Sequence, residues 1–393
     1  MKIKDVISGT KKRLSRNNRQ RRHKQGDSIR DVDHIANLSE GARIDHVEDL
    51  VLWQGSNGID KSIATLKSLE HQPQATTIKW DGKPAVIFGR NESGEFVMTD
   101  KSGFGAKGYD GKVTSPDALA KMLLSRKGDN RQGYAEYMRG LWPYFEKATP
   151  KDFRGYVHGD LLYGQTPKVE KGKITFQPNT TAYHVNPRST IGKKIAQSKA
   201  GVVLHAKINF DGTTEKVDAN NFMSGELLVM PPQTVQQPAE VDVPALDELE
   251  AYASKFRTSI DNMLNVPADL KVSDFAKIIY SYINSATKSG NLGNIGLDDF
   301  VSWLQTSKVS VPKQQRIVEY LQKHSKAFSG MFEIISGIQK VKNQIIDQLD
   351  KRPADITATT DGNPGGEGYV VGGDVKLVNR SGFSAANARM NQN

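Results

Sequence analysis

Apolar positions along the chain change their spacing several times, and each change predicts a different kind of element. Between residues 31 and 75 the spacing is helical, and Gly55 and Gly58 are expected to divide this region into two helices. From residue 76 to about residue 230, short apolar runs separated by Gly, Asn and Asp predict β-strands. One helical stretch, near residues 118–142, interrupts them. The first part of the chain therefore predicts helices followed by a β-rich region.

The second part becomes helical after a cluster of prolines between residues 231 and 244, which predicts a linker. Helical spacing then runs from Leu246 to Leu349, and Ser310 followed by Pro312 is typical of a helix start. The three apolar faces consist of Leu246, Leu249, Phe256, Ile260 and Met263; of Phe275, Ile278, Ile279 and Tyr282; and of Ile335, Ile338, Val341, Ile345 and Leu349. A β pattern is expected to return only at residues 369–371 and 375–378.

These patterns predict an α+β fold in four parts. The 393 residues are enough for two or three domains with a buried core. We expect a basic tail at residues 1–30 and a β-rich domain at residues 31–237. An inserted all-helical module follows at residues 238–355, and residues 356–393 supply the closing strands of the β-rich domain.

Composition narrows the classes of protein. No apolar run approaches the roughly 20 residues that a membrane-spanning helix needs, so we expect no membrane partner. The chain has no cysteine, which excludes disulfides and thiolate metal sites, and its start lacks the apolar segment of a signal peptide. These features favour an intracellular, cytoplasmic protein. The spacing of His158, His184 and His205 is not that of a metal site, and they are expected to be ordinary strand residues.

The net charge of +10 is concentrated near the start of the chain. Residues 1–24 contain ten lysines and arginines against one acidic residue, so the remainder is nearly neutral. Such a block is usually solvated or binds phosphate backbones. We therefore expect this tail to contact nucleic acid, with a targeting or assembly signal as the alternative.

One short stretch is the strongest candidate for chemistry. The sequence Thr76-Thr77-Ile78-Lys79-Trp80-Asp81-Gly82 predicts a strand that ends at a lysine, followed by an Asp-Gly turn and a second strand from Ala85 to Phe88. A lysine at a strand end projects into the cleft that the sheet forms. There, burial and neighbouring cations can lower its pKa and free the amine as a nucleophile. The alternative is an exposed hairpin with a solvated lysine.

Further candidates follow in order. Lys101 lies in a glycine-rich segment, residues 99–105, and Asp160 ends the run Tyr156-Val157-His158-Gly159-Asp160. Tyr183 lies in a later predicted strand. Near the end of the chain, Glu367-Gly368 precedes an apolar strand, and Lys376 lies on the strand after it. A surface hairpin, an ordinary turn and core packing are the alternatives for Lys101, Asp160 and Tyr183.

The order of these motifs resembles that of the covalent nucleotidyltransferases, which comprise ATP-dependent DNA ligases, RNA ligases and messenger-RNA capping enzymes. The wider stretch, including His46-Val47-Glu48-Asp49-Leu50, also resembles ligase-like proteins of large tailed phages. The resemblance implies a ligase-type nucleotidyltransferase fold with ATP-grasp-like antiparallel sheets. It also implies ATP and Mg²⁺ as cofactors.

The resemblance assigns a role to each candidate. Lys79 would attack the α-phosphate to form lysyl-AMP, Lys376 would contact that phosphate, and Glu367 and Asp160 would hold Mg²⁺. Nucleotide contacts would come from Ile78, Asp81, Gly82, Lys101, Asp160, Tyr183 and Lys376, with Tyr183 stacking on the base. Lys101 stands where the family has arginine, Asp160 where it has glutamate, and Val378 or Asp374 where it has a second lysine.

Two differences from DNA ligases and capping enzymes narrow the class of enzyme that the resemblance implies. Residues 377–393 are too few for the OB-fold that follows this domain in DNA ligases and capping enzymes, and a helical module precedes Glu367. We therefore expect an RNA ligase-like enzyme that joins 5′-phosphate to 3′-OH ends, in a host cytoplasm or a virion if phage-encoded. The alternatives are a DNA ligase of unusual architecture and a catalytically weak structural or nucleic-acid-binding phage protein. RNA and DNA ends, and ATP and GTP, remain open.

Overall fold

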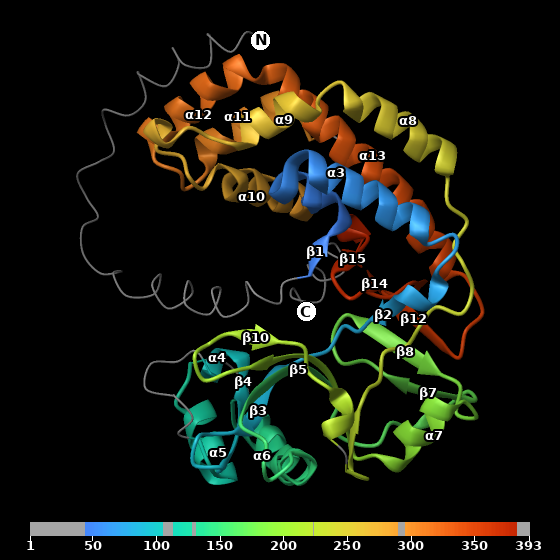
Figure 1. The fold of residues 1–393 in the computed structure, drawn as a ribbon. Helices are drawn as coiled ribbons and strands as arrows, with labels where there is room; N and C mark the ends of the chain where they lie inside the picture. The colour runs from blue at the N-terminus through green and yellow to red at the C-terminus, as the bar shows by residue number, and fades with distance from the viewer. Residues whose placement is uncertain (1–43, 105–112, 128–130, 223, 290–294, 383–393) are drawn as a thin grey trace.

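The protein has an α+β fold, as the sequence predicted, arranged as two lobes (Figure 1). The computed structural model describes residues 44–104, 113–127, 131–222, 224–289 and 295–382. The basic tail and the start of the first predicted helical region lie outside these ranges. One lobe contains most of the helices and a small sheet, and the other contains two larger sheets.

The largest sheet belongs to the second lobe and is mostly antiparallel. Its strand order is β10-β9-β5-β3-β4, and β11 pairs with the start of β9. The strands are β3 (Ala85–Arg90), β4 (Phe96–Asp100), β5 (Gly155–Tyr163), β9 (Ala200–Ile208), β10 (Thr214–Glu215) and β11 (Leu227–Val229). The helices are α4 (Lys101–Phe104), α5 (Pro116–Leu124) and α6 (Arg131–Ala148), so the one helix expected near residues 118–142 is two helices. Phe88 and Phe145 pack edge to face between the sheet and α6.

A second sheet in this lobe has the order β13-β12-β8-β7-β6. Its strands are β6 (Val169–Glu170), β7 (Lys173–Phe176), β8 (Thr181–Val185), β12 (Ile356–Thr360) and β13 (Asn363–Pro364), and α7 (Thr190–Gln197) packs against it. The expectation that β structure returns only at residue 369 was wrong, because β12 is a strand. Only Ile356 of β12 is buried, so the strand shows no apolar alternation in the sequence.

The helical lobe has one continuous apolar core. Its helices are α3 (Leu50–Ser68), α8 (Val243–Ser254), α9 (Arg257–Leu264), α10 (Phe275–Lys288), α11 (Leu297–Thr306), α12 (Val311–Lys323) and α13 (Ser325–Asp350). The face expected over residues 246–263 is divided between α8 and α9, which meet at Phe256. Leu50, Ile59 and Leu66 of α3 belong to this core, so residues 238–355 share their core with an N-terminal helix.

The expected helix break in residues 50–68 occurs at Gly55 and not at Gly58. Gly55 has φ 57° and ψ −131° within α3, and the next amide, of Ser56, donates to Asp261 Oδ1 at 2.8 Å. Gly58 is helical, and a Cβ there would lie 1.9 Å from the carbonyl oxygen of Leu50. The first glycine therefore kinks the chain, and the second permits close packing.

A four-stranded sheet joins the two ends of the described chain. Its order is β1 (Asp45–His46), β15 (Val375–Leu377), β14 (Gly368–Val371) and β2 (Thr76–Lys79). One face presents Tyr369, Val371, Val375 and Leu377 to the core of the helical lobe. Successive strand residues point to opposite faces, so the other face carries His46, Lys376, Thr77 and Lys79. We call this second face the lysine face.

Candidate functional site on the lysine face

Lys79 and Glu367 meet where β2 pairs with β14. The antiparallel register places Lys79 opposite Gly368. Lys79 Nζ lies 2.5 Å from Glu367 Oε2, and both side chains are mostly buried. Gly368 has φ +139°, and a Cβ there would lie 2.0 Å from the carbonyl oxygen of Leu377. Only glycine fits this position, and its backbone fixes the preceding glutamate beside the lysine.

Burial sets the electrostatics of this pair. Burial raises the pKa of the Glu367 carboxyl above its ordinary value, although the positive charge of Lys79 and its hydrogen bond act against that rise. Lys376 also lowers the pKa of Glu367 by its charge, so it lies within electrostatic reach of the pair. Lys79 of β2, Lys376 of β15 and Glu367, which immediately precedes β14, therefore share one environment.

Asp160 approaches the same place from β5 of the other lobe. Gly82 lies directly against it, since a Cβ on Gly82 would be 2.6 Å from Asp160 Cβ. The next amide, of Lys83, donates to the carbonyl oxygen of Leu161 at 2.8 Å. The turn after Lys79 is thus pressed onto β5, and this brings the aspartate within reach of the Lys79 charge.

Asp160 has a histidine partner that sequence reasoning missed. His205 Nε2 lies 2.8 Å from Asp160 Oδ2. The pairing of β5 with β9 is irregular next to Gly159, and His205 is the extra residue of β9 at this bulge. Burial would raise the pKa of Asp160, but the His205 hydrogen bond and the nearby positive charges hold it below its ordinary value. His205 lies in strand β9, as expected, but its contact with Asp160 was not predicted, because a bulge gives no sequence signal.

Lys101 and His158 lie on the other side of this pair. The His158 and His205 rings are 5.3 Å apart. Burial, followed by the positive charge of His205, lowers the pKa of His158 to about 4, and Lys101 lowers it further. Lys101, at the start of α4, therefore lies within electrostatic reach of His158, on the same side of the molecule as Asp160 and His205.

Asp81 and Tyr183 hold the turn after Lys79 in place. Asp81 Oδ1 accepts from Asn179 Nδ2 at 2.8 Å, and Oδ2 accepts from the amides of Thr180 and Thr181 at 3.0 Å. The Asp81 amide donates to the Tyr183 hydroxyl at 2.6 Å. Tyr183 is 0% exposed and packs against Trp80 with ring centroids 4.6 Å apart. In this structure both predicted nucleotide contacts are structural supports of the motif.

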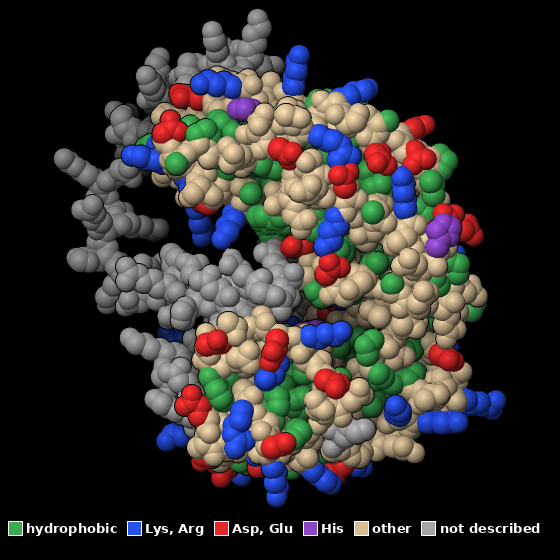
Figure 2. Space-filling view, in the orientation of Figure 1, with side chains coloured by type: hydrophobic (Ala, Val, Ile, Leu, Met, Phe, Trp, Pro, Cys, Tyr) green, Lys and Arg blue, Asp and Glu red, His purple; other side chains and the backbone are tan. Residues whose placement is uncertain are grey.

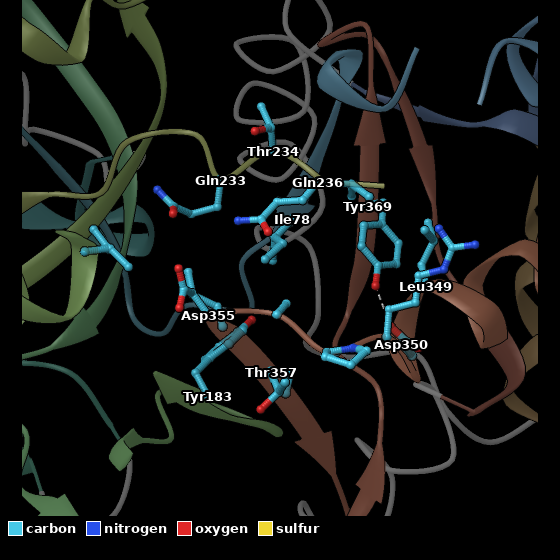
Figure 3. Close-up of a pocket in the computed structure, with 18 of the residues that line it drawn as sticks. Ile78, Tyr183, Gln233, Thr234, Gln236, Leu349, Asp350, Asp355, Thr357 and Tyr369 are labelled. Carbon is cyan, nitrogen blue, oxygen red and sulfur yellow. Dashed lines mark hydrogen bonds between the residues drawn. The ribbon is translucent and has the colours of Figure 1, made fainter. Parts of the chain in front are cut away.

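Ile78 and Tyr183 line a pocket of about 260 Å³ (Figure 3). Its walls come from β14, β12, α7, the end of α13 and the segment around Gln233. Tyr369 donates a hydrogen bond to Asp350 Oδ1 at 2.8 Å beside it. Ile78 and Lys79 are successive strand residues, so this pocket lies on the opposite face of β2 from the lysine. Lys79 and Glu367 do not line it.

Four buried charges lie beside the lysine face. Lys342 of α13 contacts Glu48 at 2.8 Å, and Arg380 contacts Asp49 at 2.8 Å. All four side chains are at most 4% exposed. Sequence reasoning missed the partners of Glu48 and Asp49, because nothing in the sequence distinguishes Lys342 or Arg380 from other cations.

The carboxylates of Glu367 and Asp160 suit Mg²⁺. Among the described residues, no three His, Asp or Glu side chains come together as a protein-only metal cage. Mg²⁺ is usually bound by one or two carboxylates together with substrate phosphates and water. Glu367 and Asp160 fit that pattern of binding.

Comparison with known proteins places the chain in a family. The profile of a family of unknown function, DUF6267, matches residues 42–392, and the chain belongs to that family. No curated protein matches the chain. No solved structure matches it either. Of the helices that the structure describes, none has both the length and the apolar character needed to cross a membrane.

Proposed function

We propose that this protein is an ATP-dependent polynucleotide ligase of the covalent nucleotidyltransferase type, acting on RNA ends. The observation that carries the proposal is the contact of Lys79 with Glu367, with Lys376 on the same face and Asp160 opposite. These residues come from opposite ends of the chain and from both lobes. Their joint placement at one point supports a shared chemical role.

The first step would join Lys79 to the nucleotide. The Lys79 ammonium first loses a proton to water, and bound Mg²⁺ together with the nearby charge of Lys376 would favour the neutral amine. The amine lone pair then forms a bond to the α-phosphorus. The bond from that phosphorus to the bridging oxygen breaks, and pyrophosphate leaves with the electron pair. A second proton leaves the nitrogen with the departing pyrophosphate.

The other residues would support charge and position. Lys376 is placed to stabilise negative charge that develops on the α-phosphate. His205 holds the Asp160 carboxylate in a single orientation. Mg²⁺, held through Glu367 and Asp160, would neutralise phosphate charge and orient the leaving group. In the later steps, the nucleotide would pass to a 5′-phosphate and be released when a 3′-OH attacks.

The polynucleotide would be held in part by the basic tail. On the face shown in Figure 2, Lys and Arg side chains alternate with Asp and Glu over both lobes. This mixed surface agrees with a nearly neutral body, so the concentration of charge in residues 1–24 stands apart from it. Phosphate contacts from such a segment supply affinity without reading sequence.

The proposal is tested by incubating the full chain with Mg²⁺ and ATP or GTP labelled at the α-phosphate. We expect label that survives denaturation, and we expect Lys79→Arg to abolish it, because guanidinium stays protonated. The matched control is Lys83→Arg, an exposed lysine of the same turn, which should keep the label. Labelled Lys79→Arg protein, or unlabelled wild type with both nucleotides, would overturn the proposal.

A further inference from the structure

His46 occupies a fixed position on the lysine face. Strand β1 has only two residues and pairs in parallel with β15, and this pairing places His46 beside Lys376. Lys376 in turn pairs with Val370, and Val370 pairs with Thr77. These four residues form one row across the sheet. Since the face alternates along β2, the row lies on the same side as Lys79.

The imidazole of His46 has an unsatisfied polar atom. Its Nδ1 is buried, and no hydrogen-bond partner for it is present among the described residues. A buried polar atom without a hydrogen-bond partner destabilises the folded protein. Such atoms are rare in native proteins, and one at a candidate site points to a ligand that completes the hydrogen bond.

The surroundings of His46 are cationic. Burial first, and then the positive charges of Lys376, Arg380, Lys342 and Lys79, hold the pKa of His46 well below its ordinary value. The ring is therefore neutral at neutral pH, and one of its nitrogens carries a proton that it can donate. A neutral donor among cations suits a phosphate oxygen, which accepts hydrogen bonds and is drawn by the positive charge.

Two buried ion pairs hold β1 against β15. Glu48 and Asp49 follow His46 after Val47, and they pair with Lys342 of α13 and with Arg380, three residues after β15. Buried ion pairs add little stability over apolar packing, but they fix geometry. A two-residue strand has few hydrogen bonds of its own, so these pairs determine where the imidazole lies.

We propose that His46 binds the pyrophosphate part of the nucleoside triphosphate at the Lys79 site. This inference rests on the proposed function. Although β1 and β2 lie three strands apart, the positive charge of Lys79 lowers the pKa of His46, so the two side chains lie within electrostatic reach of each other. Lys376 stands beside His46 and extends its charge to Glu367. A triphosphate with its α-phosphate at Lys79 would therefore direct its terminal phosphates toward Lys376 and His46. His46 donates a hydrogen bond to these oxygens and transfers no proton.

The test uses two amide substitutions of His46 in the full chain. The side-chain amide nitrogen of His46→Asn lies the same number of bonds from Cα as Nδ1 of the histidine. The amide nitrogen of His46→Gln lies the same number of bonds from Cα as Nε2. We measure the Kd of inorganic pyrophosphate by calorimetry, labelling by α-labelled ATP, and sealing of an oligonucleotide that already carries 5′-AMP. The last reaction needs no triphosphate. His184→Gln is the matched control, because His184 lies on β8 away from the lysine face.

We expect His46→Gln to weaken pyrophosphate binding by about tenfold or more, as expected for loss of one hydrogen bond to a charged group. Labelling at limiting ATP should fall similarly, sealing of the adenylylated oligonucleotide should be kept, and His46→Asn should recover part of the affinity. Unchanged pyrophosphate binding in His46→Gln would refute the role of His46. So would an equal loss in all three measurements. Unlabelled wild type would refute the proposed function instead, so the two failures are separate.

Discussion

Replacing Lys342 with methionine should destabilise the helical lobe selectively. Lys342 is 1% exposed, and its Nζ lies 2.8 Å from Glu48, which is 0% exposed. Methionine has a similar length and is apolar, so the change removes the charge and leaves little cavity. It leaves the Glu48 carboxylate buried, with Arg380 at 3.6 Å as its nearest remaining cation.

The magnitude follows from the burial of both charges. Removing one partner of a buried ion pair typically costs about 3–5 kcal/mol, because the other charge stays desolvated. Arg380 offsets part of this cost, so we expect roughly 3 kcal/mol, at the low end of that range. Replacing both partners, in Glu48→Gln with Lys342→Met, should cost less than either single change, because no unpaired charge remains.

The assay must resolve the two lobes, since a chain with two cores need not unfold in one step. Hydrogen exchange in increasing urea, read on peptides of α13 and of α6, reports the lobes separately. Lys342→Met should lower protection in α13 and leave α6 unchanged. Lys340→Met, an exposed lysine on the same helix, is the control and should have little effect. A single-variant cost below about 1 kcal/mol, or additive costs in the double variant, would refute the reasoning.

The remaining predictions concern the site, the pocket and the tail. Glu367→Ala should raise the activation free energy of labelling by about 2–4 kcal/mol at saturating Mg²⁺, and the labelling rate should fall accordingly. An unchanged rate would remove Glu367 from the site. Burial raises the pKa of Asp350 to about 6, so its contribution to stability should fall as pH rises from 4 to 7, by up to about 3 kcal/mol. In thermal melts Asp350→Asn should therefore reduce the loss of stability over this pH range relative to wild type, whereas the exposed control Asp355→Asn should not. Deleting residues 1–24 should flatten the salt dependence of oligonucleotide binding and leave labelling within a few-fold; an unchanged slope would assign the tail another role.

Local patterns predicted the regular elements well. The strands predicted to end at Lys79 and to run from Ala85 to Phe88 are confirmed in β2 and β3, where turn residues separate two short β-prone runs. The helical faces that begin at Phe275 and Ile335 are confirmed in α10 and α13. β12 was missed for the opposite reason: its threonines are half-buried, and only pairing with β8 and β13 makes it a strand.

In the candidate site, too, some residues could be predicted from their sequence neighbours and others only from the folded structure. Lys79 and Glu367 stand next to turn residues or glycines at strand ends, and Asp160 follows Gly159 within β5; the sequence shows these glycines and turns. His46 and His205 are candidates only because another segment lies beside them. A two-residue strand positions His46, and a bulge positions His205. Neither the partner of a single polar residue nor its burial can be deduced from its sequence neighbours.

The glycines of the two motifs explain why the site needs both lobes. Gly82 brings the turn after Lys79 against Asp160, and Gly368 lets β14 lie against Leu377 of β15 while it pairs with Lys79. Each glycine is therefore required by close approach of two backbones. The strands that pair here are far apart in sequence, since Thr77 and Val370 are separated by 293 positions. Contacts of such separation form only after much of the chain is ordered. The lysine is thus placed beside its glutamate and aspartate only when both lobes have folded.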